Sequence, residues 1–253
     1  MLQLESDETG IPLSAIHHDI WHVVRLNSYP VQEVSLCDDS VPCMETPVSS
    51  KTPSLTQATQ ATKDLEAFSV YLKLDEPIGD EEVHRNLGGT RELLRSTHNL
   101  TKFDLAFAYT CMEADDSTTI TVAADLLLQN DFAKLRTLSL YMLRIPQQKL
   151  FVALNRCCNS LQTFELTYAV LPATRSGQWT VMLRYVRTMP QLYDLKLDHI
   201  CERHDGSNTE VHVKRPEQPV VLQVKAKDRE TVLSELDEVL AYGLVFLPFD
   251  LDW

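Results

Sequence analysis

A short pattern of apolar residues recurs along the chain. Each copy reads apolar, two residues, apolar, one residue, apolar, as in LRTLSL, LQTFEL and LYDLKL. The copies begin at residues 31, 65, 100, 135, 161 and 192, so their separations are 34, 35, 35, 26 and 31 residues. The alternating apolar positions predict a short strand with one buried face. Because one such strand cannot bury that face alone, the recurrence predicts a stack of strands.

The segments between these copies carry apolar residues at helical spacing. We predict helices over residues 14–26, 80–97, 117–131, 146–158, 177–189 and 228–242, and a further strand over residues 220–224. Strands that follow one another through helices pair in parallel. The sequence therefore predicts an α/β fold: an irregular leucine-rich-repeat-like solenoid with a parallel sheet and flanking helices.

The repeat organises residues 1–253 as one domain, and two segments fall outside the pattern. Residues 37–62 are rich in Ser, Thr and Pro without periodicity, and we predict a flexible insertion there. Residues 202–219 are polar and contain the turn signal Asp205-Gly206, which predicts an exposed loop. An α/β enzyme with the leucine motifs as ordinary buried strands would show the same alternation of elements. The order of the strands in the sheet distinguishes the two alternatives.

The stretch from residue 132 to 200 resembles the C-terminal half of fungal F-box proteins with degenerate leucine-rich-repeat-like domains. The matching parts are LRTLSLYML, LQTFELTYAVL and SGQWTVMLRYVRTMPQLYDLKL, and DRETVLSELDEVLAYGLVFLP resembles the close of such proteins. The resemblance implies the substrate-recognition part of a ubiquitin ligase receptor, with a protein substrate and a Skp-type adaptor as partners. The sequence departs from the family in two ways. The F-box itself is not evident, and Ala108, Leu143 and Ala169 stand where regular repeats carry Asn or Cys.

Composition and charge exclude several classes of partner. The chain has 36 acidic and 23 basic residues and a formal net charge of -13, which disfavours binding to nucleic acid or to an anionic membrane surface. The six cysteines show no CxxC spacing, and Cys157 and Cys158 are expected to pack as small apolar residues near a helix end. The first residues show no secretory signal. We therefore expect reduced thiols and a cytoplasmic or nuclear location.

The chain lacks the sequence motifs of the common catalytic and cofactor sites. GxSxG and P-loop motifs are absent. His199, Cys201 and His204 are residue types that bind zinc, but no second matched pair accompanies them. His18 and His22 have helical i, i+4 spacing and lack a third ligand. We therefore predict no catalytic residue, no cofactor and no metal site, and we interpret the protein as a non-enzyme.

The most informative site prediction concerns strand positions that point away from the predicted core. In each motif, the fifth and seventh positions lie on the face opposite the apolar side chains. Aligned across the strands, they are predicted to form one continuous surface. Its mixture of tyrosine and charged residues is typical of protein interfaces, although a solvated surface without a partner is the alternative. We expect a protein partner to contact Tyr71, Asp104, Tyr141, Glu165, Lys196 and Asp198.

Overall fold

The structure, a computed structural model, describes residues 2–5, 33–38, 64–72, 91, 94–107, 117–172, 177–204 and 207–248. Its strands are β1 (Leu2–Glu5), β2 (Glu33–Asp38), β3 (Ala67–Leu72), β4 (Lys102–Phe107), β5 (Thr137–Arg144), β6 (Thr163–Pro172), β7 (Asp194–Asp198), β8 (Cys201–His204), β9 (Ser207–Val213), β10 (Val220–Val221), β11 (Val224–Ala226) and β12 (Leu244–Pro248). Its helices are α6 (Ser117–Leu128), α7 (Gln147–Cys157), α8 (Gln178–Arg187) and α9 (Arg229–Tyr242). Arg91 and residues 94–96 are also helical.

Every predicted copy of the leucine motif forms a strand. The motif starts at residues 31, 65, 100, 135, 161 and 192 correspond to strands that begin at residues 33, 67, 102, 137, 163 and 194. The first apolar residue of the motif precedes the strand by two positions and is buried in five described copies, as Leu65, Leu100, Leu135, Leu161 and Leu192. This residue anchors the turn into the strand, as the spacing predicted.

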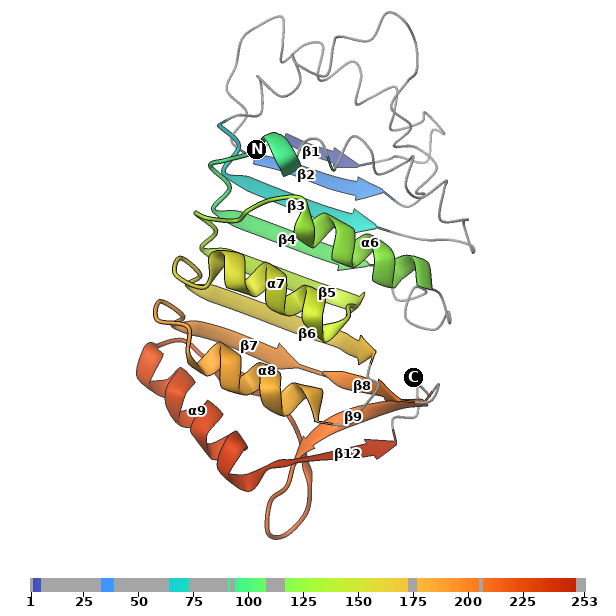
Figure 1. Ribbon diagram of the computed structural model, residues 1–253, viewed down its shortest axis with the longest axis vertical. Coiled ribbons are helices and arrows are strands. Elements are labelled where there is room, and N and C mark those ends of the chain that lie inside the picture. The colour runs from blue at the N-terminus through green and yellow to red at the C-terminus, as the bar shows by residue number, and fades with distance from the viewer. Residues whose placement is uncertain are drawn as a thin grey trace, which may run out of the picture.

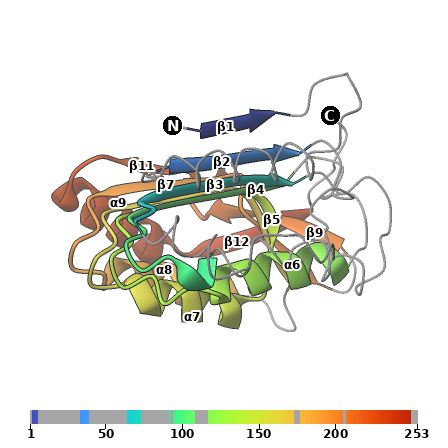
Figure 2. The ribbon, with the colours of Figure 1, turned by 90° about the horizontal axis from the view of Figure 1, so that it is seen from above.

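The strands β1 to β7 lie side by side in the order in which they occur along the chain, and each pairs in parallel with the next. Figure 1 shows this ladder of strands with the helices in front of it. Figure 2 shows α6, α7, α8 and α9 on the same side of the sheet. The fold is therefore α/β, with an open, mostly parallel sheet and flanking helices.

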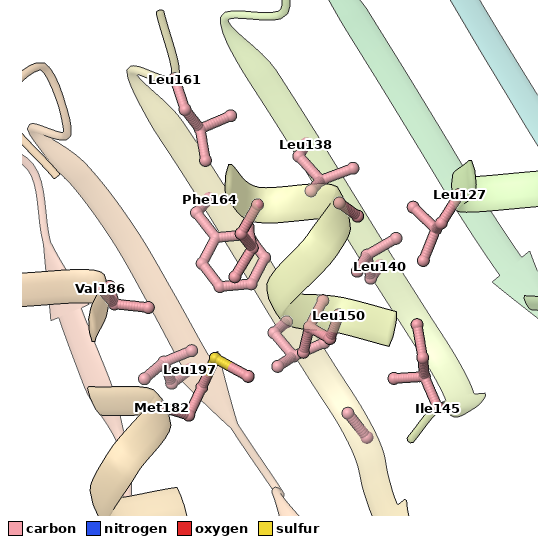
Figure 3. Close-up of a cluster of buried hydrophobic side chains, with 14 of the residues drawn as sticks. Leu127, Leu138, Leu140, Ile145, Leu150, Leu161, Phe164, Met182, Val186 and Leu197 are labelled. Atoms are coloured by element: carbon pink, nitrogen blue, oxygen red, sulfur yellow. The ribbon is translucent and has the colours of Figure 1, made fainter. Parts of the chain in front are cut away.

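The hydrophobic core fills the space between the sheet and this helical layer. Figure 3 shows Leu138, Leu140, Phe164 and Leu197 from the strands meeting Leu150 and Met182 from helices α7 and α8. All are at most 1% exposed. The predicted helices over 117–131, 146–158, 177–189 and 228–242 are confirmed within a few residues as α6, α7, α8 and α9. None of these described helices is long and apolar enough to cross a membrane.

The predicted exposed loop over residues 202–219 is largely wrong. Strands β8 and β9 form an antiparallel hairpin there, and β12 adds a further antiparallel strand to β9. Val211 and Val213 face the core. Glu202 is only 2% exposed, and its carboxylate accepts hydrogen bonds from backbone N–H groups at the start of α8. Among the residues of this segment that the structure describes, 214–219 form an exposed connection. The predicted parallel sheet is thus a mixed sheet, with antiparallel strands at its C-terminal end.

Three further predictions fall mainly outside the described residues. The helix predicted over 14–26 lies wholly outside them. Of the insertion predicted over 37–62, Cys37 and Asp38 belong to β2, and the rest lies outside. The helix predicted over 80–97 is described only at Arg91 and residues 94–96, which are helical.

Candidate interaction surface on the sheet

The predicted partner-binding residues lie on the face of the sheet that points away from α6, α7, α8 and α9, here called the far face. Strand register places them in two adjacent rows. The Tyr141 row consists of Tyr71, Ala106, Tyr141, Thr167 and Asp198. The Glu165 row consists of Ser69, Asp104, Ser139, Glu165 and Lys196. All six residues predicted from the sequence belong to these rows, so the predicted alignment is confirmed as geometry.

The residues of the two rows differ in how much surface they offer. Tyr141 is 38% exposed, whereas Tyr71 is half-buried and packs against the core. Asp104 accepts a hydrogen bond from the Ser69 hydroxyl at 2.7 Å and lies 2.9 Å from the Lys102 ammonium. Glu165 makes no hydrogen bond or ion pair with the residues that the structure describes. The far face thus combines an exposed tyrosine with a carboxylate that is available to a partner.

A left-handed backbone residue recurs at the same place in three successive repeats. Met142, Tyr168 and His199 have φ values of 51°, 51° and 47°, and each lies two positions after the last apolar residue of its motif. Such values are uncommon for residues other than glycine and are typical of bulges and turns. The register passes over Met142 and Tyr168 and resumes at Leu143 and Ala169, which are buried. These residues therefore return each strand to the core after a local bulge.

The bulges bring three rings together on the far face. The rings of Tyr168 and His199 stack with centroids 4.6 Å apart and an interplanar angle of 1°. Tyr141 meets Tyr168 edge to face, with centroids 5.6 Å apart and an angle of 82°. Such aromatic pairs are worth about 0.5–1.5 kcal/mol beyond the burial of their area. The Tyr141 ring is therefore held by a neighbour that is itself held by His199.

A buried carboxylate fixes the histidine end of this aromatic cluster. Glu210 is 9% exposed, with Oε1 3.3 Å from Nδ1 of His199 and Oε2 3.0 Å from Nε2 of His212. Nε2 of His199 lies 3.7 Å from Asp198, which also accepts a hydrogen bond from Gln223 at 2.9 Å. Both imidazoles thus share one carboxylate, and this contact orients the His199 ring against Tyr168.

The sequence missed Tyr168, Glu210 and His212. Tyr168 was not predicted as a surface residue of the far face, because the bulge changes which residue of the strand reaches that face. Glu210 and His212 lie in the segment predicted as a loop, although their alternation with Val211 and Val213 is a strand pattern that the sequence already contained. That alternation was the signal that would have placed both side chains on one face.

The zinc-type residues are distributed in a way that does not favour ligation. His199 is stacked on Tyr168, and Cys201 is 3% exposed. Burial and, to a smaller extent, the nearby Glu210 carboxylate raise the pKa of the Cys201 thiol from 9.0 to about 12. Within the described residues, no group of three or more His, Cys, Asp or Glu side chains is placed to hold a metal ion. His18, His22 and the side chain of His204 lie outside the description.

Comparison with known proteins finds no family model, no curated protein and no solved structure that matches this chain. Its function is therefore inferred from its own residues and their geometry.

Proposed function

We propose that this protein is a binding protein: an irregular leucine-rich-repeat-like solenoid that contacts a protein partner through the far face of its sheet. The observation that carries the proposal is the alignment of Tyr141, Asp104 and Glu165 with their neighbours in two rows across the strands. Tyrosine is enriched in protein interfaces and often carries much of the binding energy, and charged groups are typical of the polar rim around such a residue. The cluster of Tyr168 and His199 supplies that rigidity.

The arrangement of the repeats supports a solenoid over a doubly wound enzyme. Doubly wound α/β enzymes carry helices on both faces and bind ligands where the strand order reverses. The described parallel strands β1 to β7 instead follow chain order, and α6 to α9 lie on one side (Figure 2). The left-handed residue repeated at Met142, Tyr168 and His199 also favours stacked structural repeats.

We further propose that the bound protein is the substrate of an F-box-type ubiquitin ligase receptor. The support is the resemblance of residues 132–200 to the C-terminal half of fungal F-box proteins. Co-purification of the full chain with a Skp-type adaptor tests this narrower proposal. A stable stoichiometric complex supports it. If the purified chain and adaptor do not associate, the ligase role is wrong and a general binding role is left.

Site-specific photo-crosslinking tests the wider proposal. A benzophenone amino acid is introduced on the far face at Ser139 or Lys196, and as matched controls on the helical layer at Val152 or Val181. The two controls are 44% and 51% exposed, so a lack of crosslinks there is not caused by burial. The chains are then illuminated in extract of the source cells, and crosslinked proteins are identified by mass spectrometry.

We expect one discrete crosslinked protein from the far-face positions, competed by excess unlabelled chain, and none from the helical positions. The identified protein is then purified, and its affinity is measured for the wild-type chain and for Tyr141→Ala. Truncating a central aromatic anchor costs about 2 kcal/mol, which lowers affinity by about 30-fold. Equal crosslinking from both layers, or unchanged affinity, contradicts binding through the far face.

A further inference from the structure

Tyr141 lies on β5 among small neighbours on the far face. Ala106 lies beside it in the Tyr141 row, and Ser139 is two residues before it on the same strand. On the β6 side, the edge-to-face contact with Tyr168 fixes the ring. Because its small neighbours do not cover it, 38% of Tyr141 reaches solvent. A partner side chain can therefore lie against a ring whose orientation is already set.

Two carboxylates flank this tyrosine diagonally. Asp104 and Glu165 are the Cα partners of Ser139 on the two neighbouring strands. Strands about 4.8 Å apart, with same-face residues about 6.6 Å apart, place each diagonal Cα about 8 Å from that of Tyr141. One long side chain lying over the ring can therefore reach the carboxylates on both sides.

The two carboxylates differ in what they offer to a partner. Oδ1 of Asp104 is shielded from solvent, and Oδ2 accepts a hydrogen bond from Ser69 and lies 2.9 Å from the Lys102 ammonium, so Asp104 offers a partner its negative charge at Oδ2. Glu165 makes no hydrogen bond or ion pair with described residues, and Lys196, its Cα partner on β7, lies one strand farther from Tyr141. The charged groups diagonal to the ring are thus both anionic.

We propose that Tyr141, Asp104 and Glu165 form a seat for an arginine side chain of the protein partner. The inference rests on the function proposed above and adds the chemistry of the partner. A guanidinium group is planar, stacks on aromatic rings and donates N–H groups in its plane to carboxylates. The net charge of -13 favours approach of a basic partner. Because Tyr168 and His199 already hold the ring, ordering it on binding costs little.

Fluorine NMR of the full chain labelled with 3-fluorotyrosine tests the seat directly. The Tyr141→Phe variant identifies the Tyr141 resonance. The probe is N-acetyl-arginine amide, titrated at constant ionic strength, and its matched control is N-acetyl-citrulline amide, which is planar and uncharged. We expect a saturable shift of the Tyr141 resonance with the arginine probe and no saturable shift with citrulline. Equal responses to the two probes overturn the proposal, as does the absence of any shift.

Carboxylate variants separate a local seat from the general negative charge. Glu165→Gln is expected to weaken binding of the arginine probe by about threefold, in the range of an exposed ion pair. Combining it with Asp104→Asn weakens binding further. Glu217→Gln combined with Glu235→Gln removes the same charge from the 214–219 connection and α9, and should leave binding unchanged. Circular dichroism verifies that each variant is folded. An equal loss in the control pair shows only bulk electrostatics and refutes the seat.

The two proposals fail in different ways. Photo-crosslinking from Ser139 and Lys196 does not depend on the charge of the partner. If it captures a protein while the arginine probe leaves Tyr141 unaffected, the seat is wrong and the binding role stands. If the probe binds at Tyr141 and no protein is captured from the far face, the seat exists and the proposed protein-binding role fails.

Discussion

The carboxylate of Glu202 links β8 to the start of α8, and its removal should weaken folding measurably. Oε2 accepts the Gly177 N–H at 3.2 Å and Oε1 accepts the Trp179 N–H at 3.1 Å. Gly177, the N-cap residue, supplies no capping side chain of its own. The residue from β8 therefore satisfies two N–H groups that the helix leaves unpaired, and its negative charge interacts favourably with the helix dipole.

The expected loss follows from these contacts. A hydrogen bond to a charged group contributes about 1.5–3 kcal/mol, and the side chain is 2% exposed, so water does not easily replace it. Glu202→Ala should therefore lower the free energy of unfolding by about 3 kcal/mol. Glu202→Gln keeps the shape and one acceptor oxygen, and about 1.5 kcal/mol is expected, since the amide group faces a second donor.

Urea unfolding monitored by circular dichroism, with the slope of each transition compared between variants, measures this loss. Glu217→Ala is the matched control because the same residue type lies in the exposed 214–219 connection, where changes stay within about 0.5 kcal/mol. A value for Glu202→Ala no larger than that of the control would refute the buried capping role and the hairpin that positions it.

Four further predictions concern the core and its cysteines. Burial raises the pKa of Cys157 and of Cys201 from 9.0 to about 12. Both thiols should therefore resist a thiol reagent at pH 8 in the native protein and react with it in urea. The half-buried Cys158 is the positive control in the native state. Because the folded state keeps these two thiols protonated up to about pH 12, they contribute fully to the free energy of unfolding below about pH 9. This contribution is lost as the pH rises from about 9 toward 12, and urea unfolding measured across that range detects the loss. Asn130→Ala should lower the free energy of unfolding by about 2–3 kcal/mol. The buried amide donates hydrogen bonds to the Leu94 and Thr97 carbonyls and accepts one from the Phe132 N–H. A loss below about 0.5 kcal/mol contradicts this role. Phe164→Ala removes a fully buried ring and should lower the free energy of unfolding by about 3–5 kcal/mol in the same assay. A decrease as small as that caused by a substitution at an exposed position would contradict the packing in Figure 3.

Most of the fold could be predicted from the spacing of apolar residues, because that spacing is a local property. The anchor leucine and the alternating positions specify where each parallel strand begins and which face is buried, and all six strands predicted from the motif were found. The further strand predicted over 220–224 is divided between β10 and β11. The same alternation placed Tyr141 and Glu165 on the face opposite the core. The polar hairpin of β8 and β9 was missed because its charged residues are buried by specific partners, which composition does not reveal.

The sequence by itself determined the six strands of the repeated motif, the helices α6 to α9 and the candidate face, since each follows from the period of hydrophobic side chains within a short segment. Only the tertiary structure decided that the strands lie in chain order, that Glu202 caps α8, and that Glu210 joins His199 to His212. These features depend on contacts between residues far apart in the chain or across a tight hairpin. Backbone geometry at Met142, Tyr168 and His199 was likewise found only in the structure, because positive φ values are uncommon for residues other than glycine and the local sequence at these positions carries no glycine or turn signal.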